Sequence, residues 1–192
     1  MLPPRSSRLL LLGLAFSAAA CNGTRSIATY NTAYSFALFA LTGAPTNAST
    51  ALSFLGGSAA ATSTFGFDVA VDIDPAGAAR LYPVRTLAGG LAGATKRVGL
   101  QLVPATTFDA LREAPSTGYD TLGSKVVTAG SVVAVEIQDV ATCLYSLSGS
   151  TLLHAKLVVD SIKPDTRRIY GRTVVDPNCG FYGLLVDTIP TR

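Results

Sequence analysis

The sequence predicts an all-β protein, an antiparallel β-sandwich or small barrel of about eight to ten short strands with one short helix. Residues 65–73, 131–139 and 152–160 carry this prediction, because each alternates apolar with polar or small side chains. Alternation with a period of two is typical of a strand with one face in the core and the other in solvent. Turn residues separate the apolar segments at intervals of roughly 8–12 residues, as in sandwiches and barrels.

The first half of the domain contains five expected strands. The run YNTAYSFALFAL is apolar and aromatic, and it predicts a buried strand or strand pair. In FGFDVAVDI the aromatic and β-branched residues face the core, and Asp68 and Asp72 face solvent. Asp74 to Gly77 form a turn with proline in second place, and Pro83 marks the returning strand as an edge or bulged strand. The expected strands cover 30–41, 51–55, 65–73, 79–87 and 98–102.

The second half contains one expected helix and four strands. Thr107 can cap a short helix over 108–114, which Pro115 would end. In the strand LLHAKLVVD the apolar residues alternate toward the core, so His154 and Lys156 fall on the polar, exposed face. The expected strands cover 131–139, 152–160, 168–175 and 181–186.

The N-terminus predicts export. Residues 1–20 form a signal peptide, with Arg5 and Arg8 before the apolar run LLLLGLAF and the small residues SAAA after it. The apolar run is too short to span a bilayer, which takes about 20 helical residues. The segment Ala18-Ala19-Ala20-Cys21 resembles the lipobox of bacterial lipoproteins that signal peptidase II cleaves, with alanine in place of the usual leucine at residue 18. Ala18-x-Ala20 also suits the ordinary signal peptidase.

The resemblance implies that Cys21 is the lipid-bearing first residue of the mature protein. Residues 21–29 would be a lipid-attached tether, and 30–192 a single β-rich domain. In known lipoproteins Asn22 in place of aspartate implies sorting to the outer membrane. The alternative is a soluble periplasmic or secreted protein.

The three cysteines support the lipobox. Exported proteins normally pair their thiols, so an odd cysteine requires an explanation. Lipidation of Cys21 leaves Cys143 and Cys179 to form a disulfide. The other interpretations are a free thiol at Cys21 and two buried free thiols at the remaining pair.

Composition argues against nucleic acid as a partner. The chain of 192 residues is 48% hydrophobic and 14% charged, with a net charge of +3. Loss of Arg5 and Arg8 with the signal peptide leaves 13 basic and 12 acidic residues. A nearly neutral domain lacks the excess of positive charge that is typical of proteins that bind nucleic acid.

Few residues suggest catalysis or a metal site. His154 is the only histidine, so a nucleophilic triad and a zinc site both lack residues. Asp72, Asp74 and Gly77 resemble the opening of a calcium loop, but Ala76 and Pro83 occupy positions where ligands belong, so we expect a plain hairpin. A carboxylate pair of the glycosidase type is defined by the distance between the two groups in the folded protein, so spacing in the sequence does not reveal it. The chain has only two glutamates, Glu113 and Glu136. Possible surface aromatics are Tyr34, Tyr119, Tyr145 and Tyr182.

The C-terminal half carries a second, faint resemblance. The segments FDAL, HAKLVVDSI and VDPNCGF resemble uncharacterised bacterial secreted lipoproteins and, more distantly, β-sandwich haem-scavenging lipoproteins. Their haem sites use paired axial His or Met, and here only His154 would remain after signal cleavage, so we expect no cofactor. The sequence favours a non-enzymatic envelope lipoprotein, a binding or structural module held at the membrane by its lipid. The alternative is a carboxylate-based secreted hydrolase.

Overall fold

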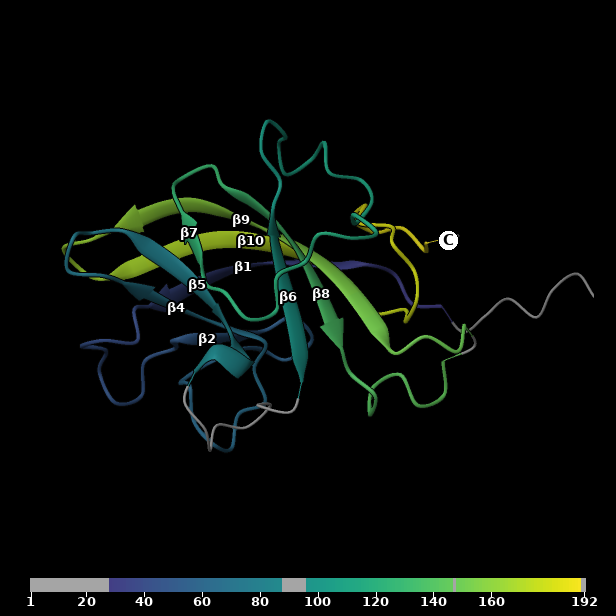
Figure 1. Ribbon diagram of the computed structural model, residues 1–192, viewed down its shortest axis with the longest axis horizontal. Coiled ribbons are helices and arrows are strands. Elements are labelled where there is room, and N and C mark those ends of the chain that lie inside the picture. The colour runs from purple at the N-terminus through teal and green to yellow at the C-terminus, as the bar shows by residue number, and fades with distance from the viewer. Residues whose placement is uncertain (1–27, 88–95, 147, 191–192) are drawn as a thin grey trace, which may run out of the picture.

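The computed structural model describes residues 28–87, 96–146 and 148–190, and ten strands in this part of the chain form two antiparallel sheets (Figure 1). The first sheet has the order β1-β10-β9-β8-β6 and the second the order β3-β2-β4-β5-β7. The first sheet contains β1 (Thr32–Phe39), β6 (Arg97–Leu102), β8 (Val132–Gln138), β9 (Leu152–Lys163) and β10 (Arg168–Asp176). The second contains β2 (Ala51–Ser53), β3 (Gly57–Ala59), β4 (Val69–Ile73), β5 (Ala79–Pro83) and β7 (Lys125–Val127). The all-β prediction is confirmed, as a sandwich and not a closed barrel.

The core lies between the two sheets, where alternating residues of facing strands meet. Val69, Val71 and Ile73 of β4 are buried there with Leu153 and Leu157 of β9. Burial of one such side chain contributes about 1.5–3 kcal/mol. The alternation predicted for 65–73 and 131–139 therefore describes real core faces.

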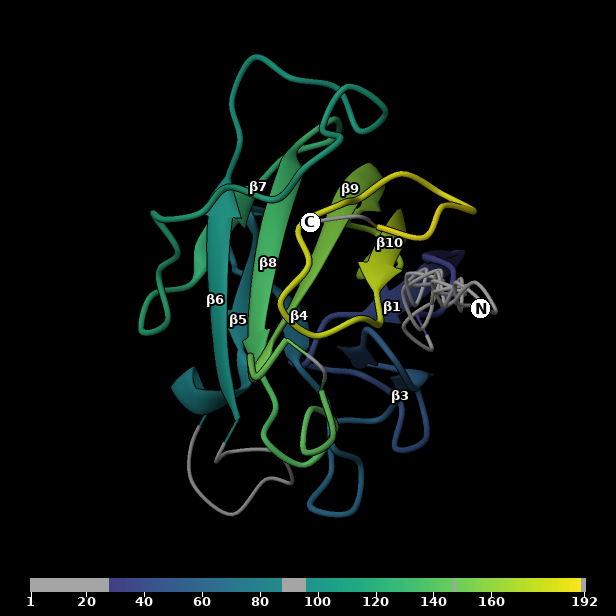
Figure 2. The same ribbon diagram turned by 90° about the vertical axis from the view of Figure 1, so that its right-hand side faces the viewer.

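The first sheet is also covered on its outer face, which the alternation did not predict. Residues 103–120 and 181–190 cross this face, and their apolar side chains form a second cluster with β8, β9 and β10. In Figure 2 the teal and yellow loops can be followed beside these strands. Strand β9 is consequently buried on both faces from Leu153 to Val159. The second cluster contains Phe108, Leu111, Ala114, Val132, Ala134, Val158, Val174 and Leu184.

Two of the expected elements are wrong, and several expected strands are shorter than expected, among them 65–73, which is a strand only from Val69 to Ile73. The expected helix over 108–114 is a single turn, in which Thr107 Oγ1 accepts a hydrogen bond from the Ala110 N–H at 3.2 Å. The chain then leaves helical geometry to pair with the expected strand 181–186, which forms only an isolated bridge, Glu113 with Gly183. The expected strand 79–87 ends at Pro83, where the 3-10 helix η1 (Val84–Thr86) begins.

Loops gather at two ends of the sandwich, on the left and right of Figure 1. At one end the β4–β5 and β9–β10 turns lie together, and we call it the Arg167 end. At the other, the loop 139–146 and the turn 177–180 are joined by the disulfide between Cys143 and Cys179. The described chain enters there, because the Thr29 N–H donates to Asn178 Oδ1 at 2.7 Å. We call this the Thr29 end.

Candidate functional site

A row of three ionisable residues crosses the outer face of the first sheet. The register places Glu136 of β8 and Asp176 of β10 on either side of His154 of β9. The prediction that His154 is exposed is wrong, since its exposed fraction is 0%. The C-terminal segment and the segment around Tyr119 cover the row and exclude water from the imidazole.

The contacts of His154 fix its neutral tautomer. Its Nδ1 lies 2.7 Å from the carbonyl oxygen of Phe181, which can only accept, so Nδ1 carries the proton. Nε2 has no hydrogen-bond partner in the described part of the chain and lies 3.8 Å from a carboxylate oxygen of Glu136. Burial lowers the pKa of His154, although the Phe181 hydrogen bond and the Glu136 charge act in the opposite direction.

Two tyrosines and a second acid complete the buried group. The Tyr182 ring stacks on His154 with centroids 4.3 Å apart. Tyr119 has a buried hydroxyl without a hydrogen-bond partner among the described residues, and burial raises its pKa. Burial also raises the pKa of Asp176 to about 6, against hydrogen bonds from Asn178 that lower it. The covering segments thus enclose an imidazole, two tyrosine rings and neighbouring carboxylates.

A pocket lies next to this cluster. It has a volume of about 530 Å³. Tyr182 lines the pocket, and the ring of the same residue stacks on His154. Residues that line the pocket come from the two covering segments and the turn 177–180: Glu113, Ala114, Ser116, Gly180 and Tyr182. A small ligand bound there would contact Tyr182 and a carboxylate.

Lys156 is also buried, which corrects the prediction that it faces solvent. Its exposed fraction is 2%, and its Nζ donates to the carbonyl oxygens of Phe108 and Leu111 at 2.7 and 2.8 Å. The same ammonium lies 4.5 Å from the centre of the Phe108 ring. Burial lowers the pKa of Lys156. Lys156 therefore holds the 107–111 turn on the sheet.

At the Thr29 end two aspartates meet at one lysine. Lys96 Nζ lies 3.2 Å from Asp68 and 3.3 Å from Asp139. Asp68 is 2% exposed, so its expected place on the solvent face is wrong. Burial raises the pKa of Asp68 despite the charge of Lys96. For Asp139 burial is outweighed by hydrogen bonds from Thr142 and Lys96, and its pKa is lowered.

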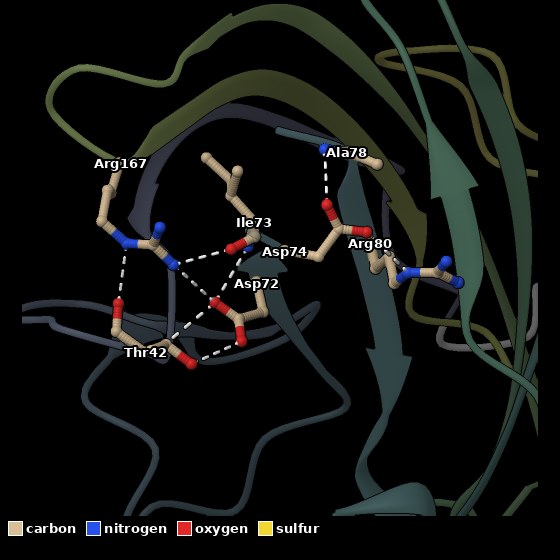
Figure 3. A network of polar contacts seen from close by, with 7 residues as sticks. All are labelled: Thr42, Asp72, Ile73, Asp74, Ala78, Arg80 and Arg167. Carbon is tan, nitrogen blue, oxygen red and sulfur yellow. Dashed lines mark hydrogen bonds and ion pairs between the residues drawn. The ribbon is translucent and has the colours of Figure 1, made fainter. Parts of the chain in front are cut away.

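At the Arg167 end the aspartates of the expected hairpin bind other side chains (Figure 3). Asp72 accepts hydrogen bonds from Arg167 at 3.1 Å and from the Thr42 hydroxyl at 2.8 Å. Asp74 accepts from the backbone of Ala78 at 2.9 Å and closes the hairpin turn. The predicted hairpin between β4 and β5 is present. Among the described residues no group of three or more His, Cys, Asp or Glu is placed to hold a metal ion.

The predicted disulfide is present. Cys143 and Cys179 are joined with their Cα atoms 5.8 Å apart. The prediction for Cys21 lies outside the described residues. Of the four predicted surface aromatics only Tyr145 is strongly exposed, at 91%; Tyr34, Tyr119 and Tyr182 are half-buried.

The basic partners of Asp68 and Asp72 had no local signal in the sequence. Lys96 is 28 residues from Asp68, and Arg167 is 95 residues from Asp72. No helix of the described segments is both long and apolar enough to cross a bilayer. No protein-family model, curated protein or solved structure matches the chain.

Proposed function

We propose that the protein is an exported, non-enzymatic lipoprotein of the cell envelope, anchored through Cys21 in the outer membrane. The observation that carries the proposal is the Cys143–Cys179 disulfide. Disulfides persist in oxidising compartments outside the cytosol. With that pair joined, Cys21 is the one unpaired cysteine of the chain, and it stands directly after the small residues that a lipoprotein signal peptidase accepts.

A role in binding or architecture fits the covered outer face of the first sheet. His154 lies under the Tyr182 ring with its Nε2 buried, so a substrate would have to displace covering side chains before it reached Nε2. The pocket beside Tyr182 remains available to a small ligand. We assign ligand binding to this pocket, without turnover.

The anchor is tested by membrane fractionation in a bacterial host supplied with a fatty-acid probe. The wild-type protein should fractionate with membranes and carry the probe. The Cys21→Ser protein should lose both, and an Asn22→Ser control that keeps the cysteine should retain both. Membrane attachment with label in the Cys21→Ser protein would refute the anchor.

The alternative is a carboxylate-based hydrolase at Asp68 and Asp139. Their pKa values are displaced in opposite directions, as an acid and a base require. However, Lys96 forms ion pairs with both carboxylates, so a substrate would have to displace its ammonium group. Chromogenic glycosides and esters should therefore give no turnover. Hydrolysis that Asp68→Asn abolishes would favour the hydrolase.

A further inference from the structure

The loop 139–146 at the Thr29 end exposes apolar side chains to solvent. Val140 is 59% exposed, Leu144 64% and Tyr145 91%. Residues 140–146 read VATCLYS and include no charged residue. Exposure of several large apolar side chains on one short loop is the usual mark of an interaction surface.

The loop holds these side chains in position. Cys143 is tied to Cys179 by the disulfide. The Thr142 N–H donates to Asp139 Oδ1 at 3.0 Å, and the Ser146 N–H donates to the Cys143 carbonyl at 2.9 Å. The apolar groups are therefore presented by an ordered turn, and little conformational entropy remains to be lost when they are covered.

The Arg167 end has the opposite character. Its turns carry Lys163, Asp165 and Arg167, and Arg167 joins the polar network drawn in Figure 3. Charged, hydrated turns suit the end that faces water. These charged turns contrast with the uncharged residues 140–146 at the Thr29 end.

The chain that would carry the lipid arrives at the apolar end. The Thr29 N–H donates to Asn178 Oδ1 at 2.7 Å, and the Asn178 amide donates back to the Thr29 carbonyl at 2.8 Å. Asn178 is the neighbour of Cys179, so this entry point lies beside the disulfide. Eight residue steps separate Cys21 from Thr29 and span at most about 29 Å. Strand β9 alone, at 12 residues, is about 40 Å long.

We propose that the loop 139–146 docks on the phospholipid surface that holds the Cys21 lipid, with Val140, Leu144 and Tyr145 in the interfacial layer. The inference rests on the proposed lipid anchor. Tyrosine favours this layer, since its apolar ring and polar hydroxyl suit the boundary between acyl chains and head groups, and leucine buries its apolar side chain on the acyl side. The short tether holds the loop close to the lipid surface.

Two basic residues at the same end suit a surface with anionic lipids. Arg85 follows β5, whose last residue, Pro83, pairs with Val69. Arg97 pairs with Gln138, the residue directly before the loop. Both are exposed. Basic side chains near a membrane add electrostatic attraction to anionic head groups.

Tryptophan fluorescence tests the docking, because the chain contains no tryptophan. Tyr145→Trp introduces a single reporter in the loop, and Thr166→Trp introduces a matched exposed reporter at the Arg167 end. Both lipidated full-length proteins are reconstituted into vesicles of phosphatidylethanolamine and phosphatidylglycerol, with and without a lipid spin-labelled near its head group. Emission of the Tyr145→Trp protein should shift to the blue and lose intensity with the spin-labelled lipid. Emission of the Thr166→Trp protein should change in neither respect, and adding Leu144→Asp to Tyr145→Trp should reduce the quenching.

Vesicle flotation separates this proposal from the anchor. Protein that floats with the vesicles without quenching of the Tyr145→Trp reporter overturns the docking and leaves the anchor standing. A blue shift without quenching by the labelled lipid shows that another protein surface covers the loop, and it also overturns the docking. Protein that does not float overturns both proposals.

Discussion

Loss of the Cys143–Cys179 disulfide should lower the free energy of unfolding by about 4 kcal/mol, from the loop-closure entropy that returns to the unfolded chain. The bond spans a sequence separation of 36 residues, and this length sets the magnitude. For a domain of this size each 1 kcal/mol moves the melting temperature by roughly 2–4 °C, so a fall of about 8–16 °C is expected. The comparison is made in the Cys21→Ser background, so that the remaining thiol does not interfere.

The folded structure should persist without the bond, because other contacts hold the same turn. The Ser148 hydroxyl donates to the Cys179 carbonyl at 2.7 Å, and the Gly180 N–H donates to the Leu152 carbonyl at 2.8 Å. Chemical denaturation of the Cys143→Ala/Cys179→Ala double variant measures the loss, and thiol titration of the denatured, unreduced parent should find no reactive thiol. An unchanged midpoint, or two reactive thiols in the parent, would refute the reasoning.

Three further perturbations test other parts of the structure. Lys156→Met leaves two buried carbonyls without a donor and should destabilise by about 1–3 kcal/mol in urea denaturation; the exposed control Lys163→Met should stay within about 0.5 kcal/mol. Asp176 has its pKa raised from 3.8 to about 6, so the folded state binds the proton more tightly, and stability falls as pH rises from about 4 to 6, by up to about 3 kcal/mol. Asp176→Asn should therefore gain stability relative to the parent at pH 7 but not at pH 4, and an equal difference at both would contradict this. Arg167→Ala removes the hydrogen bond to Asp72 and those to the Thr42 and Ile73 carbonyls, and should lower the melting temperature by a few degrees, from a loss of about 1–2 kcal/mol; no change would show that the network contributes nothing.

Local patterns predicted the inner half of the sandwich correctly. Core faces in 65–73 and 131–139 follow from alternation, because neighbouring side chains of a strand point to opposite faces whatever the rest of the chain does. The Asp74–Gly77 turn follows from residues that act within four positions. The Cys143–Cys179 pair followed from the count of cysteines and the expected compartment, with no geometry required.

The outer half was decided by tertiary structure. His154 and Lys156 occupy the alternate positions of β9 that normally face water, and a polar residue at such a position gives no local sign that another segment will cover it. Lys156 is buried because two carbonyls 45 and 48 residues away supply its acceptors. The expected helix 108–114 and the expected strand 181–186 do not form because residues 112–114 and 182–184 pair with each other over the sheet.

The sequence by itself determined the strand class, the positions of most strands, the core face and the disulfide, since each depends on short-range periodicity or on composition. Tertiary structure alone decided which sheet is covered on both faces, which carboxylates bond Lys96 and Arg167, and which loop presents apolar side chains beside Thr29. Those features depend on contacts between residues far apart in the chain, and such contacts exist only once the two sheets have packed.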